Sequence, residues 1–180
     1  IMENKLSSEF DVTIVGGLGH VGLPLGIAFA DKDLRVCLCD IDKNKAEAVQ
    51  RGEMPFIEYG AEPILKKAIR NGKLTVSLDD SSVSKAKYVI IAIGTPVDEY
   101  LNPKTRAFLE FFENLKKHLN PCQTIIIRST VHPHTCRQIL NLLGNGKEWK
   151  IAYCPERIVQ GYALKELQEL PQIVAGLSEK

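Results

Sequence analysis

The chain has 180 residues, of which 44% are hydrophobic, so it is long enough for one domain with a well-packed core. Its 23 Lys and Arg residues nearly balance its 22 Asp and Glu residues, which gives no reason to expect binding to nucleic acid or to a membrane surface. The sequence lacks an apolar run of the roughly 18 residues needed to span a bilayer, a signal peptide and an even number of cysteines, so we expect a soluble, cytoplasmic protein.

Apolar, β-branched runs alternate along the chain with segments of helical pattern. Strands are expected at residues 10–15, 34–39, 74–77, 88–93, 124–127 and 149–153, with a further short one at 172–175. Helices are expected at residues 21–30, 43–51, 63–70, 108–119 and 135–143. The polar stretch 98–106 is expected to be a mobile loop.

The expected strands are continuous apolar runs rather than alternating ones, a pattern typical of a parallel sheet that is covered on both faces. We therefore predict an α/β protein of the Rossmann type, with a doubly wound, mainly parallel sheet and helices on both faces. Because the chain ends soon after the last expected strand, we expect residues 1–180 to be one domain of a longer protein.

A glycine-rich loop follows the first expected strand. Its sequence has the G-x-G-x-x-G spacing of dinucleotide-binding loops and reads Gly17-Leu18-Gly19-His20-Val21-Gly22. In such loops the first glycine permits a tight turn, the second lets the backbone approach a diphosphate, and the third lets the helix pack closely on the strand. The start of the helix then offers N–H groups and a partial positive charge to the phosphates.

An acidic residue, Asp40, ends the second expected strand, 18 positions after Gly22 and close to the roughly 20 expected of an acid that binds the adenosine ribose. A carboxylate there accepts hydrogen bonds from the ribose hydroxyls and repels a 2′-phosphate, so the pattern favours NAD over NADP. Lys45 follows on the next expected helix, where its ammonium either meets the cofactor or faces solvent. We expect Asp40, Lys45 and the six residues of the loop to bind NAD.

Five segments, in order, resemble the UDP-glucose/GDP-mannose dehydrogenase family and together cover nearly the whole chain. They are Gly19-His20-Val21-Gly22-Leu23-Pro24-Leu25, Gly94-Thr95-Pro96, Ile127-Arg128-Ser129-Thr130-Val131, Tyr153-Cys154-Pro155-Glu156-Arg157-Ile158 with Gly161, and Pro171-Gln172-Ile173-Val174-Ala175-Gly176. The Pro-Glu-Arg form of the fourth segment is more similar to the branch that oxidises UDP-N-acetylhexosamines, such as UDP-N-acetylmannosamine, than to the UDP-glucose branch.

The resemblance implies that residues 1–180 are the NAD-binding Rossmann domain of a nucleotide-sugar 6-dehydrogenase. Such an enzyme oxidises the C6 alcohol of a UDP-sugar to the uronic acid with two NAD, and a cysteine captures the intermediate aldehyde. The family's catalytic cysteine, lysine and asparagine, its central helix and its C-terminal UDP-binding domain would lie beyond Lys180. We therefore expect this chain alone to be inactive, and the full-length enzyme to be a homodimer joined through the central helix.

Three residues match site positions of the family. Thr130 matches a threonine in the cofactor crevice that helps to hold the catalytic water, although it also suits the N-cap of the following helix. Thr95 matches a residue beside the nicotinamide, or else belongs to an ordinary turn. Glu156 matches the first active-site glutamate, an acid/base or water-orienting group, or else forms a surface ion pair with Arg157.

The chain departs from the family pattern at three places. His20 stands where tyrosine is usual, and Gln160 stands where the UDP-glucose branch has a second glutamate, so the group that replaces this base is open. Glycine is usual near His134. No metal site is expected, because His132 and His134 lack an evident third ligand.

Two other functions share part of the pattern. A non-catalytic, NAD(H)-sensing Rossmann regulatory module also has a glycine loop and an acid at the end of a strand, but it gives no reason for Arg128-Ser129-Thr130 or Pro155-Glu156-Arg157. A 3-hydroxyacid dehydrogenase shares the fold, but usually has methionine where this chain has Val21.

Overall fold

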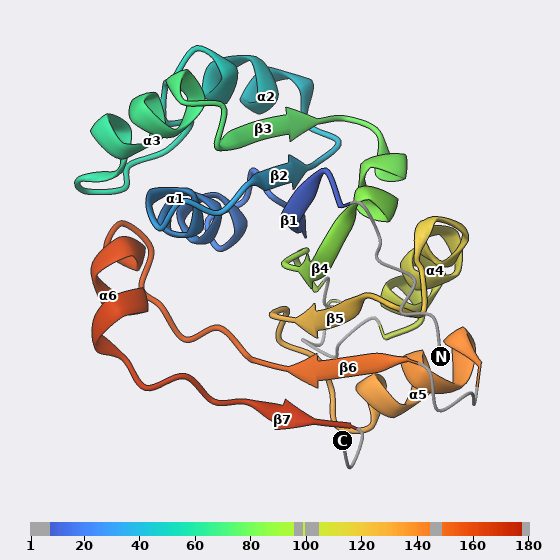
Figure 1. The fold of residues 1–180 in the computed structure, drawn as a ribbon. Helices are drawn as coiled ribbons and strands as arrows, with labels where there is room; N and C mark the ends of the chain where they lie inside the picture. Colours follow the sequence, from blue (N-terminus) through green and yellow to red (C-terminus); the bar gives the residue numbers. More distant parts are fainter. Residues whose placement is uncertain (1–7, 96–98, 100–104, 145–148, 178–180) are drawn as a thin grey trace.

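The computed structural model describes residues 8–95, 99, 105–144 and 149–177. Within these residues seven strands form one sheet in the order β3-β2-β1-β4-β5-β6-β7 (Figure 1). The strands are β1 (Phe10–Val15), β2 (Val36–Cys39), β3 (Leu74–Ser77), β4 (Ala86–Ile91), β5 (Thr124–Ile127), β6 (Lys150–Tyr153) and β7 (Ala175–Gly176). Every neighbouring pair from β3 to β6 is parallel, and β7 runs antiparallel to β6. The predicted Rossmann-type sheet is confirmed.

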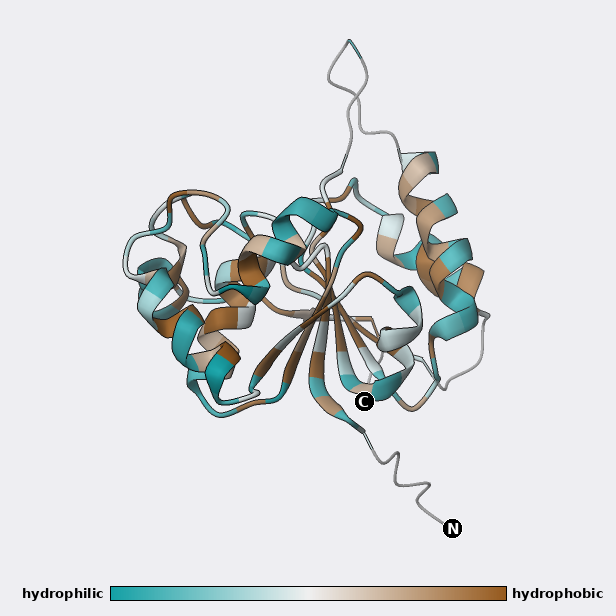
Figure 2. Ribbon diagram, turned by 90° about the horizontal axis from the view of Figure 1, so that it is seen from above, coloured by the Kyte–Doolittle hydropathy of each residue, from teal (hydrophilic) through white to brown (hydrophobic). Residues whose placement is uncertain are grey.

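Helices cover both faces of this sheet. They are α1 (Gly22–Asp31), α2 (Lys43–Gln50), α3 (Ala61–Arg70), α4 (Thr105–Leu115), α5 (Thr135–Leu143) and α6 (Ala163–Glu169), with two 3-10 helices, η1 (Asp80–Lys85) and η2 (Lys116–His118). Helix α1 packs against α3 and α6 on one face, and α4 packs against α5 on the other. Figure 2 shows the hydrophobic strands lying between these two layers. In the described part of the chain no helix is long and apolar enough to cross a membrane.

Each face of the sheet has its own hydrophobic core. On the first face, Ile14 and Leu38 pack with Leu23 and Ile27 of α1, and all four side chains are fully buried. On the second face, apolar residues of β4, β5 and β6 pack against α4 and α5, and the large side chain of Phe112 is fully buried among them. Burial of each large apolar side chain contributes roughly 1.5–3 kcal/mol to the stability of the fold. The two cores therefore hold the strands, and the polar residues at their ends, in fixed positions.

Most of the expected elements are present, with local differences. The strands at 10–15, 74–77 and 124–127 and the helix at 135–143 have the predicted bounds. The helix expected at 108–119 begins earlier, at Thr105, and its last turn becomes η2. The last strand is Ala175–Gly176 rather than 172–175 and is antiparallel, while η1 and α6 were not predicted. Of the expected loop 98–106, residues 98 and 100–104 lie outside the described part.

Candidate functional site

The glycine loop joins β1 to α1 and owes its shape to close backbone packing. Gly16, which precedes the motif, has φ 76°, so the left-handed residue of the turn out of β1 is Gly16. A Cβ on Gly17 would lie 2.8 Å from the Cα of Leu38 on β2. A Cβ on Gly22 would overlap the carbonyl oxygen of Gly16. The two glycines therefore let the loop lie against β2 and let α1 start against β1.

The start of α1 is open to an anion. A Cβ on Gly19 would meet one neighbour, the carbonyl oxygen of Gly16, at 3.4 Å, so the backbone here is accessible from the cleft side. The N-cap residue Val21 makes no side-chain cap hydrogen bond, and the described first turn of α1 contains no acidic residue. N–H groups at such a helix start suit a phosphate group, so the loop fits a dinucleotide's diphosphate.

Asp40 lies beside this loop, as predicted, because β1 and β2 are adjacent parallel strands. Its Oδ2 accepts a hydrogen bond from the Leu18 N–H at 2.9 Å. Its Oδ1 accepts from the N–H groups of Ile41 at 2.8 Å and Asp42 at 3.2 Å. Three backbone donors thus fix a half-buried carboxylate at the edge of the loop, where the expected ribose acid belongs.

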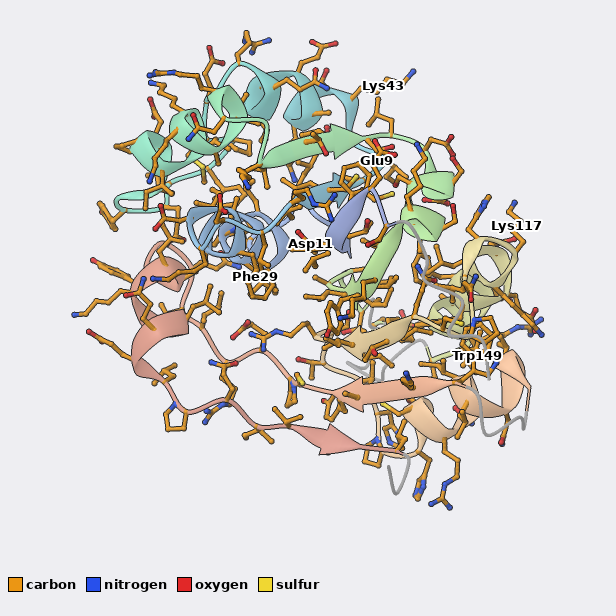
Figure 3. All side chains as sticks on the ribbon, in the orientation of Figure 1. Glu9, Asp11, Phe29, Lys43, Lys117 and Trp149 are labelled. Carbon is orange, nitrogen blue, oxygen red and sulfur yellow. The ribbon has the colours of Figure 1, made fainter. Side chains whose placement is uncertain are left out.

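Lys45 is engaged within its own helix. Its backbone N–H donates to Oδ1 of Asp42, the N-cap of α2, at 3.1 Å, and its ammonium lies 3.7 Å from Oδ2 of the same residue. The neighbouring Lys43 is exposed and points away from the body of the molecule (Figure 3). The local ion pair makes Lys45 a weaker candidate for the cofactor than Asp40, so its role stays a prediction.

A cleft of about 370 Å³ opens at the carboxyl ends of β1, β4 and β5. It lies where the strand order reverses between β1 and β4, the place at which open α/β sheets bind ligands. The cleft is lined by the glycine loop, the residues that follow β4 and β5, and Glu156 and Ile158 after β6. Six predicted site residues therefore share one cleft: Gly19, His20, Val21, Thr95, Thr130 and Glu156.

The two threonines follow β4 and β5, whose ends are joined by a hydrogen bond. Ser129 Oγ donates to the carbonyl oxygen of Ile93 at 2.6 Å, which ties the two strand ends together. Thr95 is half-buried and Thr130 is exposed, and both line the cleft. The N-cap of α5 is His134, so Thr130 does not cap that helix. His134 has φ 73°, a conformation that favours glycine, which accounts for the expectation of glycine near this position.

Glu156 forms a buried ion pair with the Arg128 guanidinium, and both side chains are less than one-tenth exposed. The alternative expectation of a surface ion pair with Arg157 is wrong. The Arg157 guanidinium donates to the carbonyl oxygen of Pro171 instead. Oε1 of Glu156 also accepts from the backbone N–H groups of Arg157 at 2.8 Å and Ile158 at 3.2 Å. A carboxylate held in this way is suited to orienting a ligand or water at the cleft wall.

Burial changes the acidity of neighbouring groups. Desolvation lowers the pKa of Arg128 from its ordinary value, and the Cys154 thiolate would oppose that shift. Burial raises the pKa of the Cys154 thiol, and the positive charge of Arg128 opposes this. On β2, burial raises the pKa of Cys39 to about 12. Cys154 and Cys39 are therefore protonated at neutral pH and do not provide a thiolate nucleophile.

The sequence analysis overlooked two residues of this site. Gly16 lies one position before the motif, and its signal was a pair of glycines at the end of the first strand. Arg128 was quoted in a family segment without a role, although a charged residue directly after a buried strand is such a signal. Among the described residues, no three His, Cys, Asp or Glu side chains gather as they would around a metal ion.

Comparison with known proteins places these features in a family. Residues 10–180 match the model described as "UDP-glucose/GDP-mannose dehydrogenase family, NAD binding domain". The UDP-N-acetyl-D-mannosamine dehydrogenase of Methanococcus aeolicus is 31% identical over 99% of this chain and 41% of its own length. The corresponding enzyme of Campylobacter jejuni is 26% identical over 96% of this chain and 45% of its own. The chain thus spans less than half the length of these relatives.

Solved structures agree with this assignment. The NDP-N-acetyl-D-galactosaminuronic acid dehydrogenase of Methanosarcina mazei Go1 is 31% identical, with a TM-score of 0.83 over 93% of this chain and 39% of that one. The UDP-N-acetyl-mannosamine dehydrogenase of Staphylococcus aureus is 29% identical, with a TM-score of 0.81 over 93% of this chain and 42% of that one.

Proposed function

The chain belongs to the UDP-glucose/GDP-mannose dehydrogenase family as its NAD-binding domain, and we propose that the longer protein oxidises the C6 alcohol of a UDP-sugar to the uronic acid. One observation carries the proposal: the glycine loop, Thr95, Thr130 and Glu156 come from four distant parts of the sequence and line one cleft. A regulatory module needs a nucleotide site, but it does not need the polar residues Thr95, Thr130 and Glu156 that line the cleft beyond the glycine loop.

The residues of the cleft have distinct roles in this proposal. The loop from Leu18 to Val21 borders the diphosphate. The N–H groups of His20 and Val21 donate to it, because those of Leu18 and Gly19 already donate to Asp40 and to the Gly16 carbonyl oxygen, and Gly17 and Gly22 allow the loop its close packing. The Asp40 carboxylate accepts hydrogen bonds from the hydroxyls of the adenosine ribose, and the Lys45 ammonium adds a positive charge near that end of the cofactor. When bound, NAD supplies the hydride acceptor for both oxidation steps.

The far end of the cleft belongs to the substrate in this proposal. Thr95 lines the nicotinamide side, and Thr130 holds a water molecule with its exposed hydroxyl. Glu156 orients the sugar or that water, because Arg128 and two backbone N–H groups already fix its carboxylate. Gln160 is exposed and cannot act as a base, so the second base of the UDP-glucose branch comes from another group.

The proposed substrate is a UDP-N-acetylhexosamine rather than UDP-glucose. The Pro155-Glu156-Arg157 segment and the names of the relatives in Methanococcus and Campylobacter support this branch. In the same proposal residues 1–180 are one domain of the enzyme. A central helix and a UDP-binding domain complete it, the full-length enzyme is a homodimer, and it works in the cytoplasm.

The test is an assay of the full-length protein for NADH formation with UDP-N-acetylmannosamine, UDP-N-acetylglucosamine and UDP-glucose. We expect turnover with an N-acetylated sugar and two NADH per sugar oxidised, because the alcohol passes through the aldehyde to the acid. Residues 1–180 alone serve as the control and should give no steady NADH formation. Tight NAD binding by the full-length protein without turnover on any nucleotide sugar would contradict the proposal and favour the regulatory module.

A further inference from the structure

A buried glutamate, Glu58, joins two segments that are far apart in the sequence. It belongs to the segment 56–59, which lies between α2 and α3. Its side chain is 6% exposed, and its Oε1 accepts a hydrogen bond from the Leu164 N–H, in the first turn of α6, at 3.2 Å. Its Oε2 is also buried and has no hydrogen-bond partner among the described residues.

This arrangement of Glu58 is costly for the fold. A buried carboxylate loses its hydration, and a single hydrogen bond replaces only part of it. An apolar side chain of similar size would fill the space without that loss. Departures of this kind from a fully satisfied interior are typical of functional sites. The contact with Leu164 is therefore explained better by what it holds in place than by stability.

The segment 154–162 leads from β6 to α6 and forms part of the cleft wall. It carries Glu156 and Ile158, which line the cleft. The first part of this segment is fixed at the sheet, because the Glu156 N–H donates to the Arg128 carbonyl oxygen at 3.2 Å and the two side chains form the buried ion pair.

The last part of the segment 154–162 is fixed by the segment 56–59. The Tyr59 N–H donates to the Gly161 carbonyl oxygen at 3.0 Å, and the rings of Tyr59 and Tyr162 pack with 5.1 Å between their centroids. The buried carboxylate adds its hydrogen bond to the start of α6, beside which this segment lies (Figure 1). The cleft wall thus has one anchor at the sheet and a second one between α2 and α3.

The second anchor also contacts the glycine loop. The ring of Phe56 packs on that of His20, with 4.0 Å between the ring centroids, and Phe56 lies against the hydrophobic core beside α1. One short segment, 56–59, therefore contacts both the loop proposed for the cofactor and the segment at the substrate end of the cleft.

Hydrogen bonds define the position of α6 more closely than its apolar contacts do. Leu164 and Leu167 pack in the same core as α1, and such apolar packing is not directional. A hydrogen bond restricts both the distance and the angle between its partners. Of the two hydrogen bonds from the segment 56–59, the one from Glu58 is made by a side chain, so a substitution can remove it.

We propose that Glu58 is a positioning residue for the nucleotide sugar: by holding the start of α6, it sets the place of the segment 154–162 at the cleft wall. This inference rests on the proposed function, in which that end of the cleft binds the sugar. Glu58 is not among the described residues that line the cleft, so it acts through Glu156 and Ile158. Because Glu156 keeps its ion pair with Arg128, loss of Glu58 weakens sugar binding more than it slows the chemical step.

The test measures kcat, the KM for NAD and the KM for the UDP-N-acetylhexosamine that the full-length wild-type protein oxidises. Glu58→Leu fills the buried space but removes the acceptor, so we expect the KM for the sugar to rise about tenfold, the range of one lost hydrogen bond. Glu58→Ala also removes the acceptor and should raise this KM to the same extent. In both variants kcat and the KM for NAD should change by less than about threefold.

Two further variants serve as controls. Glu58→Gln keeps a side-chain oxygen for the Leu164 N–H, so its KM for the sugar should stay within about twofold of the wild-type value. Glu62→Ala, on α3, removes an exposed ion pair with Lys66 and should leave all three constants unchanged. A loss of folded enzyme lowers the apparent kcat but not KM, so the KM for the sugar separates positioning from a purely structural role.

The outcomes distinguish this inference from the proposed function. A wild-type KM for the sugar in Glu58→Leu and Glu58→Ala would overturn the role of Glu58 and leave the proposed function intact. An equal rise in Glu58→Gln would do the same, because that variant retains the acceptor. If the wild-type protein oxidises no nucleotide sugar, the proposed function and this inference both fall.

Discussion

At the scale of single residues, the site rests on two carboxylates with different surroundings. Asp40 is fixed by three backbone N–H groups beside an open helix start, so an edge of the carboxylate stays available to a ribose. Glu156 is buried and paired with Arg128. A buried ion pair contributes little net stability when intact, but removal of one partner leaves an uncompensated charge in the protein interior.

Replacement of Arg128 by methionine should therefore be strongly destabilising. We expect Arg128→Met to lower the free energy of unfolding by about 3–5 kcal/mol, measured by urea denaturation at pH 7. The double variant Arg128→Met/Glu156→Leu should recover most of the loss, because no unpaired charge remains.

The exposed pair Arg35–Asp11 provides the comparison, with its atoms 3.0 Å apart. Arg35→Met should have a much smaller effect, because solvent screens both charges. Equal losses for Arg128→Met and Arg35→Met would show that the Glu156 carboxylate is not buried against Arg128 in solution.

The sequence predicts the position of Asp40, but it does not predict the ion-pair partner of Glu156. The position of Asp40 follows from local spacing, since the loop and the next strand are near neighbours in the chain. The partner of Glu156 depends on the pairing of β5 with β6, which brings residue 128 next to residue 156. Sequence analysis offered Arg157 because it is adjacent in the chain. It could not foresee that the Arg157 side chain reaches Pro171 instead.

At the scale of elements, the junction of β1 with α1 has the tightest packing of the site. A Cβ on Gly22 would overlap the Gly16 carbonyl, and neither backbone atom can move without shifting the helix or the strand. The N-terminal end of α1 can therefore lie this close to β1 only because residue 22 has no side chain.

Gly22→Ala should disturb both packing and binding. We expect a loss of stability of roughly 1–3 kcal/mol in thermal or urea unfolding, as for other overpacked core positions, together with weaker NAD binding. Gly94→Ala is the matched control for stability, because a Cβ at Gly94 would meet no atom within 4 Å and its φ is not positive. A Gly22→Ala variant as stable as Gly94→Ala would mean that α1 does not start against β1 as described.

Elements with strong local patterns were predicted, and those that depend on distant contacts were missed. The buried strands are β-branched runs, and their type is evident without tertiary information. Helix α6 has seven residues, and its Leu164 N–H is capped by Glu58, which lies 106 positions earlier. The residues next to α6 in the sequence therefore give no sign of this cap. The short strand β7 gains its direction from pairing with β6, so its antiparallel sense was not predictable either.

At the scale of the whole molecule, the strand order places the cleft. The first strand, β1, lies inside the sheet, with β2 and then β3 on one side of it. The next strand, β4, lies on the other side of β1. The loops after β1 and β4 therefore diverge and leave a cleft between them. The alternation of strands and helices predicts this architecture. The meeting of the glycine loop with Thr95, Thr130 and Glu156 becomes evident only once the parallel register is known.

Calorimetric titration of this chain with NAD and with NADP tests the placement of the dinucleotide most directly. We expect NAD to bind and NADP to bind weaker by on the order of tenfold or more, since a 2′-phosphate would meet the Asp40 carboxylate. Asp40→Asn should narrow this difference, whereas Asp42→Asn, which still caps α2, should keep it. Equal affinity for the two cofactors in the wild-type chain, or a preference for NADP, would contradict a ribose site at Asp40.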